Sequence, residues 1–291
     1  MRETSLEQAR PYPGLGLRLA TSAVLVPLFV GTIWIGGLVF LAGILALTAV
    51  GTVELFRLAH DKPYRARYIP GLALALALPA VLYGAPADAE IVTGLLVAGA
   101  VGVAAAQMLD RHGTEAMVSV AFTVFAALYV GLLFGHLVLL REIARARPGL
   151  TDWVGAVLLG LPLFLTWVND TAAYFIGRRW GRRRLLARVS PGKSLEGAVS
   201  AGIVTLAAAF LAVWMVDRLV PVFDPIDGLA LGILIAIAAP CGDLIVSAFK
   251  RDAGVKDMSQ VVPGHGGVLD RFDSVLVAVP LSYYYLVLCV L

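Results

Sequence analysis

This chain of 291 residues contains few cysteines and few charged residues. The two cysteines, Cys241 and Cys289, are too few for a disulfide scaffold, and no CxxC or Cys/His cluster indicates zinc. Only 15% of the residues are charged and 59% are hydrophobic, which excludes a charge-rich disordered chain. An ordinary soluble domain is disfavoured too, because the apolar residues and glycine together far exceed the roughly 45–50% usual for one. The composition indicates a polytopic membrane protein.

The charged residues form short clusters, separated by apolar stretches about as long as the 20 residues of a membrane-spanning helix. We predict an all-α bundle of about nine such helices, over residues 19–36, 37–53, 68–84, 91–109, 116–140, 153–177, 197–216, 228–249 and 274–291. The first apolar run is divided at Gly36-Gly37, because one straight helix would measure about 52 Å and the hydrocarbon core about 30 Å. One span followed by a re-entrant segment is the alternative for residues 19–53.

Lysine and arginine predict the orientation, since cytoplasmic loops carry the excess of both. With the N-terminus in the cytoplasm, 19 of the 23 basic residues lie inside and 4 outside. Three of those four fall in the segment 141–147, and the sequence offers no reason for them. We predict a cytoplasmic tail over residues 1–18 and one transmembrane domain over 19–291. Its two long polar loops, 178–196 and 250–273, are where we expect the function to be concentrated.

The first polar loop follows Asp170, a carboxylate about two helical turns inside its apolar stretch. The basic residues of this loop are Arg178, Arg179, Arg182, Arg183, Arg184, Arg188 and Lys193. Arginines at this depth commonly anchor a helix at anionic headgroups, and the alternative is a positive field that gathers phosphorylated substrates. We predict that residues 190–193, Ser-Pro-Gly-Lys, open the next helix, whose free N–H groups and dipole suit a phosphate.

The second polar loop follows Asp243, which lies in a span with Pro240 and is costly there unless paired, hydrated or bound to a cation. The residues of interest that follow are Lys250, Arg251, Lys256, Asp257, His265, Gly266, Gly267, Asp270, Arg271 and Asp273. Several carboxylates close together favour a hard cation, Mg²⁺ rather than zinc. Basic side chains and glycines beside them favour a polyphosphate. The loop therefore predicts metal-assisted phosphoryl or nucleotidyl transfer.

Structural roles are open for several of these residues. Asp243 could be a helix-packing carboxylate satisfied by neighbouring hydroxyls, and His265 could cap its turn through a backbone hydrogen bond. Asp273 could be the N-cap of the last helix. Lys250 and Arg251 could be anchors whose charged ends extend to the membrane interface.

The second loop resembles the signature of the phosphatidate cytidylyltransferases, also called CDP-diacylglycerol synthases, over residues 247–273. The matching residues are Ser247, Phe249, Lys250, Arg251, Lys256, Asp257, Ser259, Pro263, His265, Gly266, Gly267, Val268, Asp270, Arg271, Phe272 and Asp273. Upstream residues that also resemble the family are Asp170, Ala173, Tyr174, Gly177, Arg178, Ser190, Pro191, Lys193, Glu196 and Gly197. Departures from its usual residues occur at Gly192, Leu195, Val246 and Val262, and none affects the carboxylates.

This resemblance implies a nucleotidyltransferase of phospholipid biosynthesis that converts CTP and phosphatidate to CDP-diacylglycerol and pyrophosphate. It implies Mg²⁺ at two aspartates, Asp243 and Asp270, with room for a second, monovalent or divalent cation. It further implies a multi-pass homodimer in the cytoplasmic membrane, in contact with membrane lipids and with its active site facing the cytoplasm. We expect no nucleic-acid partner.

The resemblance and the residue chemistry together give each site residue an expected role. Catalytic roles are expected for Asp243, Asp270, Lys250, Arg251, Lys256 and Arg271. Nucleotide binding is expected for Lys256, His265, Gly266, Gly267 and Asp273. Binding of the lipid phosphate is expected for Asp170, Ser190, Lys193 and Arg178.

Other functions fit parts of the pattern. An ion-coupled secondary transporter would also carry intramembrane aspartates and broken helices, but Asp170 and Asp243 lie toward one face and no paired repeat is present. A CTP-dependent lipid kinase of the polyprenol type would release a nucleoside diphosphate, whereas cytidylyl transfer releases pyrophosphate. A purely structural membrane protein would not need so polar a loop before its last span.

Overall fold

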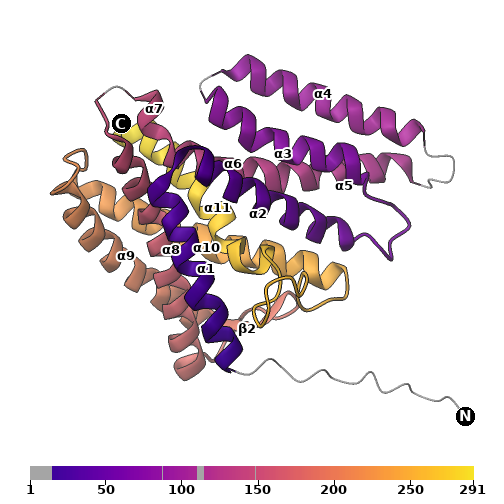
Figure 1. Ribbon diagram of the computed structural model, residues 1–291. Coiled ribbons are helices and arrows are strands. Elements are labelled where there is room, and N and C mark those ends of the chain that lie inside the picture. The colour runs from indigo at the N-terminus through magenta and orange to yellow at the C-terminus, as the bar shows by residue number, and fades with distance from the viewer. Residues whose placement is uncertain (1–14, 87, 110–114, 148) are drawn as a thin grey trace, which may run out of the picture.

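The apolar stretches of the sequence form long helices, which are interrupted where glycine, proline or charged residues gather (Figure 1). The computed structural model describes residues 15–86, 88–109, 115–147 and 149–291. The α-helices are α1 Leu15–Ile35, α2 Gly37–Arg57, α3 Tyr68–Gly84, α4 Ala89–Met108, α5 Ala116–Ala127, α6 Leu133–Arg141, α7 Ile143–Ala146, α8 Asp152–Trp180, α9 Leu195–Asp217, α10 Pro225–Asp252 and α11 Leu269–Tyr285. The π-helical turns are η1 Leu128–Leu132 and η2 Leu286–Val290, and the antiparallel strands are β1 Arg184–Leu186 and β2 Ser190–Ser194.

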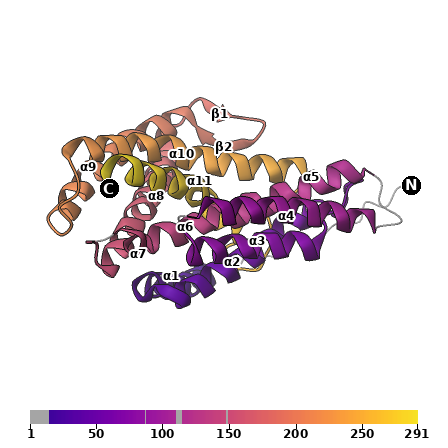
Figure 2. The same ribbon diagram turned by 90° about the horizontal axis from the view of Figure 1, so that it is seen from above.

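The helices form two groups that meet at α11 (Figures 1 and 2). In one group, α2, α4, α5 and α6 all pack against α3. In the other, α8, α9 and α10 pack against one another. Helix α11 packs along α10 and also contacts α6 and α8, while α1 contacts α2 and α8. Helix α11 therefore lies between the two groups, while the β1–β2 hairpin packs against α8, α9 and α10.

Length and apolar composition support an integral membrane protein. The described residues contain seven helical segments that are long and apolar enough to cross a membrane: Gly37–Arg57, Ala89–Met108, Ala116–Arg141, Asp152–Trp180, Leu195–Asp217, Pro225–Asp252 and Leu269–Val290. Two shorter apolar helices, Leu19–Ile35 and Tyr68–Gly84, fall in the other two predicted segments. The helical membrane class is confirmed, with the β1–β2 hairpin added to the predicted all-α fold. Nine crossings and a cytoplasmic N-terminus stay predictions.

The turn between α1 and α2 confirms the predicted division of the first apolar run. Gly36 and Gly37 both have positive φ, +66° and +56°, a backbone conformation that suits glycine. The N–H of Gly36 donates to the carbonyl of Thr32 at 2.9 Å, and the N–H of Gly37 donates to Glu142 Oε1 at 2.7 Å. The chain therefore folds back as two helices at this point instead of continuing as one.

The last helix begins earlier than predicted. Helix α11 starts at Leu269, five residues before the predicted start at Ser274. The carboxylate of Glu54 accepts hydrogen bonds of 2.9 Å from the N–H groups of Val268 and Leu269, which would otherwise lack partners at a helix start. Asp273 lies inside the helix, so the alternative that it serves as the N-cap is wrong.

The prediction that residues 190–193 open a helix is wrong. They belong to strand β2, and α9 begins only at Leu195. Pro191 fixes its own φ near a value that an edge strand tolerates and has no N–H to donate to a ladder. Ser194 then caps α9, because its Oγ accepts the N–H of Gly197 at 3.2 Å.

The buried Arg141 accounts for one of the three basic residues in the segment 141–147. Its side chain is 0% exposed, and its Nε donates to the carbonyl of Ile33. Its Nη2 donates to the carbonyl of Trp34 and to Asp152 Oδ2, each at 3.3 Å. Ile33 and Trp34 belong to the last turn of α1, whose carbonyls lack partners within the helix. Arg141 therefore caps the C-terminal end of α1.

The two other arginines of this segment, Arg145 and Arg147, bind carbonyls at the C-terminal ends of other helices. Arg145 donates to the carbonyl of Tyr83 near the end of α3 at 3.5 Å, and its guanidinium lies 4.4 Å from the centre of the Tyr83 ring. Arg147 donates to the carbonyls of Val287 and Leu291 at 3.1 and 3.2 Å. A cation at a helix C-terminus also interacts favourably with the helix dipole. Helix capping thus explains the positive charge that the sequence left unexplained.

Candidate active site

The candidate site lies where α10 and α11 cross. A Cβ on Gly242 would collide with the carbonyl oxygen of Asp273 and lie 3.0 Å from Ser274 Cα, so the two backbones touch at this point. The contact brings Asp243 of α10 close to Asp273 of α11, and Asp170 of α8 accepts a hydrogen bond of 3.4 Å from Ser274 Oγ. The three carboxylates lie within electrostatic range of one another. Three helices therefore each contribute one carboxylate to one region.

Asp243 is paired with a lysine from the β-hairpin. Lys193 lies in β2, the strand that begins at Ser190, and its Nζ forms an ion pair with Asp243 Oδ2. Ser247, one turn further along α10, donates to Asp243 Oδ1 at 3.1 Å. Both members of the ion pair are 26% exposed. The alternative that neighbouring hydroxyls satisfy Asp243 is therefore correct in part, because Ser247 donates to it. Lys193 also neutralises its charge.

Asp270 is paired with the second lysine of the site. Lys250 Nζ lies 2.7 Å from Asp270 Oδ1, and the side chains are only 12% and 6% exposed. Asp270 Oδ2 accepts the backbone N–H groups of Met258 and Gly267 at 2.8 and 3.0 Å. Lys250 is therefore a buried ion-pair partner, which does not fit the interfacial-anchor alternative. Asp270 holds the loop before α11 together.

The two predicted metal ligands fit a cation unequally. Carboxylate oxygens are the ligands that Mg²⁺ prefers, and each carboxylate already faces an ammonium group, from Lys193 or Lys250. Asp243 is accessible, whereas Asp270 is nearly buried and accepts three hydrogen bonds. Asp270 can therefore ligate an ion only when Lys250 has moved away from it. No group of three or more His, Cys, Asp or Glu residues in the described ranges is arranged for a metal. The donor chemistry suits Mg²⁺, and one ion shared by these aspartates stays a prediction.

The glycine-rich turn is irregular, as predicted. Gly266 has φ +84°, and its carbonyl accepts the N–H of Val262 at 2.9 Å, while the N–H of His265 donates back to Val262 O. The ring of His265 faces α1, where its Nε2 lies 3.1 Å from Ser22 Oγ. Arg271 Nε donates to the His265 carbonyl at 2.6 Å. The turn is thus held by its own backbone, by α1 and by the first turn of α11.

Glu54 was not identified from the sequence as a site residue. It is buried near the end of α2 and accepts hydrogen bonds from Ser259 Oγ at 2.6 Å and from the N–H groups of Val268 and Leu269. Its position at the edge of an apolar stretch predicted a loop residue. Sequence reasoning missed Glu54 because the predicted span ended at residue 53, whereas α2 continues to Arg57 and makes Glu54 a carboxylate inside a helix.

Three other predicted residues, Arg178, Arg251 and Lys256, are exposed. Arg178 Nη1 donates to the hydroxyl of Tyr174 at 2.9 Å on the exposed side of α8. Lys256 is exposed in the loop after α10. Arg251 Nε donates to the carbonyl of Val189 at 3.3 Å, which ties the end of α10 to the β-hairpin. The two polar loops predicted to carry the function are therefore in direct contact with each other.

The fold and the site together define a class: an integral membrane protein with paired carboxylates and lysines at one end of its helices, suited to anionic substrates. The chain belongs to the cytidylyltransferase family, whose model matches residues 16–289.

Individual relatives agree with this assignment. The chain is 34% identical over 275 residues to the phosphatidate cytidylyltransferase of Thermotoga maritima, and the aligned region covers 92% of this chain and 95% of the relative. It is 29% identical over 275 residues to that of Bacillus subtilis, covering 93% and 97%. It is 44% identical to that of Haemophilus influenzae over 133 residues, covering 45% of this chain and 46% of the relative. The chain thus aligns with nearly the whole length of two relatives and with less than half of the third.

Proposed function

We propose that this protein transfers the cytidylyl group of CTP to phosphatidate at the cytoplasmic face of the cell membrane, giving CDP-diacylglycerol and pyrophosphate. One observation carries the proposal: the two polar loops touch where Arg251 Nε donates to the Val189 carbonyl, and each loop supplies a lysine that pairs with a carboxylate, Lys193 with Asp243 and Lys250 with Asp270. The three relatives named phosphatidate cytidylyltransferase support the choice of CTP and phosphatidate.

The reaction places few demands on acid–base chemistry. An oxygen of the phosphatidate phosphate, already an anion near neutral pH, attacks the α-phosphorus of CTP. A new P–O bond forms as the bond to the pyrophosphate oxygen breaks. The barrier arises from repulsion between the two anions and from charge on the leaving group, so alignment and charge neutralisation supply most of the catalysis.

The residues of the two loops divide these tasks by their charge. Lys250, Arg251, Lys256 and Arg271 neutralise the α-phosphate and the leaving pyrophosphate. The nucleotide is positioned by Lys256, His265, Gly266, Gly267 and Asp273. The lipid phosphate is bound by Asp170, Ser190, Lys193 and Arg178.

Asp243 and Asp270 are the residues that would hold Mg²⁺, with space for a second monovalent or divalent cation left open. A bound Mg²⁺ supplies screening of charge on the triphosphate oxygens. Lys193 and Lys250 form the ion pairs that neutralise the same carboxylates in this structure. We propose that both lysines turn from their carboxylates to substrate phosphates when the substrates bind.

The test is an assay of purified protein in detergent with phosphatidate, labelled CTP and Mg²⁺. Lipid-linked cytidine together with pyrophosphate supports the proposal. Release of a nucleoside diphosphate with a phosphorylated lipid alcohol would instead identify a lipid kinase. Solute flux into proteoliposomes in the absence of CTP would identify a transporter.

We also propose that the protein is a homodimer, as its family resemblance implies. Light scattering of the purified protein, corrected for bound detergent, measures the mass directly. A mass of one chain would contradict this assignment without affecting the proposed reaction.

A further inference from the structure

The β1–β2 hairpin and the end of α8 carry a dense group of exposed arginines. We call this group the hairpin cluster, and its members are Arg179, Arg182, Arg183, Arg184 and Arg188. Within the described parts of the chain, none of these side chains forms an ion pair with a carboxylate. The one acidic residue between positions 171 and 216 is Glu196, which accepts the backbone N–H groups of Arg182 and Arg183 at 3.0 and 3.1 Å. Five positive charges against one negative charge leave a surplus of four, which favours an anionic partner.

Exposed apolar side chains accompany the hairpin cluster. Helix α8 is long and apolar enough to cross a membrane, and it ends at Trp180, which is 63% exposed. Phe175 of α8 and Leu186 of β1 are exposed as well. Tryptophan is enriched where the hydrocarbon core meets the headgroups. Because guanidinium groups bind phosphate oxygens while rings and alkyl groups enter the interface, the hairpin complements a negatively charged membrane surface.

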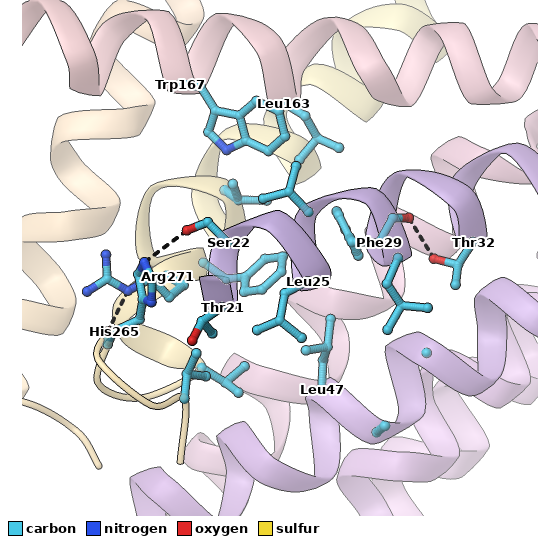
Figure 3. Close-up of a pocket in the computed structure, with 18 residues that line it drawn as sticks. Thr21, Ser22, Leu25, Phe29, Thr32, Leu47, Leu163, Trp167, His265 and Arg271 are labelled. Carbon is cyan, nitrogen blue, oxygen red and sulfur yellow. Dashed lines mark hydrogen bonds between the residues drawn. The ribbon is translucent and has the colours of Figure 1, made fainter. Parts of the chain in front are cut away.

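The hairpin cluster lies apart from the pocket that borders the signature loop. That pocket is mostly apolar, with His265 and Arg271 at the end where Thr21 and Ser22 of α1 lie (Figure 3). None of the five arginines lines it. The hairpin packs instead against α8, α9 and α10 (Figure 2). A headgroup bound at the cluster would therefore leave this pocket open.

The two strands of the hairpin connect the cluster to the candidate site. Strand β1 carries Arg184, which lies opposite Ser194 of β2 in the antiparallel pair. Lys193, the neighbour of Ser194, forms the ion pair with Asp243. The position of the arginines on β1 therefore influences where β2 holds Lys193.

We propose that the hairpin cluster binds the headgroups of anionic phospholipids that are not substrates, and that this contact fixes the hairpin and Lys193 for turnover. The surface charge of the membrane then regulates the enzyme. The effect on turnover rests on the proposed function, whereas the binding of headgroups does not. Phosphatidate is itself an anionic lipid, so a test must hold its amount constant while the other lipids change.

The experiment measures turnover in lipid nanodiscs with a fixed fraction of phosphatidate, in which phosphatidylcholine is replaced stepwise by phosphatidylglycerol. The test variant is Arg184→Gln/Arg188→Gln. The matched control is Arg57→Gln/Arg65→Gln, which removes the same charge from exposed positions on the same predicted side of the membrane. Melting temperatures of all three proteins check that they are folded.

We expect phosphatidylglycerol to raise the kcat of the unaltered protein and of the control, and to leave the KM for CTP unchanged. The hairpin variant should bind these headgroups about 25-fold more weakly and show little rise, since each arginine near an anionic surface contributes a factor of about five. High salt should reduce the rise in the unaltered protein. Without phosphatidylglycerol, all three proteins should have the same kcat. No rise in the unaltered protein, an equal rise in all three, or a lower kcat of the hairpin variant without phosphatidylglycerol would each overturn the proposal.

A second measurement uses the unaltered protein and does not depend on turnover. A phosphatidylglycerol with a photoreactive headgroup should crosslink to peptides between residues 179 and 188, and unlabelled phosphatidylglycerol, but not phosphatidylcholine, should compete. Crosslinks there without any cytidylyl transfer would support the headgroup site and contradict the proposed function. Transfer with crosslinks confined to other segments would support the function and contradict the headgroup site.

Discussion

The carboxylate of Glu54 on α2 lies 2.9 Å from the backbone nitrogen of Leu269 on α11, although 215 positions separate the two residues. The same carboxylate accepts hydrogen bonds from Val268 N–H and Ser259 Oγ, within the loop that precedes α11. One buried side chain of the N-terminal helices thus fixes the start of the helix that carries Asp270. The placement of the signature loop therefore depends on a residue outside it.

Replacing Glu54 with alanine should impair both stability and turnover. Two helix-start N–H groups and one hydroxyl would lose their acceptor, which should lower the free energy of unfolding by about 1–3 kcal/mol. A displacement of the loop by about 1 Å should lower kcat by about 100-fold. Thermal unfolding in detergent and steady-state kinetics with CTP measure the two effects.

Two further variants distinguish a loss of loop positioning from a general loss of stability in α2. Glu54→Gln keeps one acceptor oxygen, that of the amide, and should give an intermediate loss of stability and turnover. Thr48→Val on the same helix removes a buried hydroxyl that has no hydrogen-bond partner among the described residues, and it should leave turnover unchanged. Full activity in Glu54→Ala would show that α2 does not position the loop.

Asp270→Asn should abolish most activity while leaving the protein folded. The substitution removes the charge that faces Lys250 at 2.7 Å and keeps an oxygen for the backbone N–H groups. We expect kcat/KM to fall by at least about 100-fold, as for the loss of one key electrostatic contact at an active site. Formation of labelled CDP-diacylglycerol measures it, with melting temperature as the check on folding.

Asp252→Asn is the control for Asp270→Asn. Asp252 is 73% exposed and pairs with Lys62 at 3.0 Å on the surface, and such pairs contribute little. Activity of this variant should stay within about twofold of the unaltered protein. Activity retained in Asp270→Asn would remove Asp270 from the catalytic machinery.

The sequence predicted the apolar segments well because a hydrophobic run and its flanking charges are local features. The break at Gly36-Gly37 followed from length alone, and the structure confirms it. The start of α11 was misplaced because its cap, Glu54, comes from a distant helix and no local pattern records that contact. The role of Arg141 as the C-terminal cap of α1 could not be predicted for the same reason, because its partners on α1 lie more than 100 positions earlier.

The site was predicted in part. Spacing in the signature loop identified Lys250 and Asp270, and the structure pairs them. The partnership of Lys193 with Asp243 could not be read from the sequence, because it depends on a hairpin that forms where a helix was expected. Local residue types thus indicate the chemistry, while pairings between distant segments require the folded chain.

The orientation of the chain can be tested with single cysteines. After Cys241 and Cys289 are replaced, a cysteine at Asp61 should lie inside the cell and one at Pro221 outside, since 19 of the 23 basic residues lie on the predicted inside. Both positions are exposed in the structure. A membrane-impermeant maleimide should label only Pro221→Cys in intact cells and both variants after permeabilisation. The reverse pattern would place the candidate site on the outer face.

Arg141→Ala should destabilise the protein without acting on the site directly. The side chain is completely buried, binds carbonyls at the end of α1 and pairs with Asp152, so its loss leaves buried groups unsatisfied. We expect the free energy of unfolding to fall by about 3–5 kcal/mol. Arg145→Ala is the matched control, because Arg145 is 48% exposed and caps α3 through one bond of 3.5 Å. Thermal unfolding in detergent should therefore show a large shift for Arg141→Ala and a small one for Arg145→Ala, and similar shifts would mean that burial of the capping arginine is not what stabilises this face.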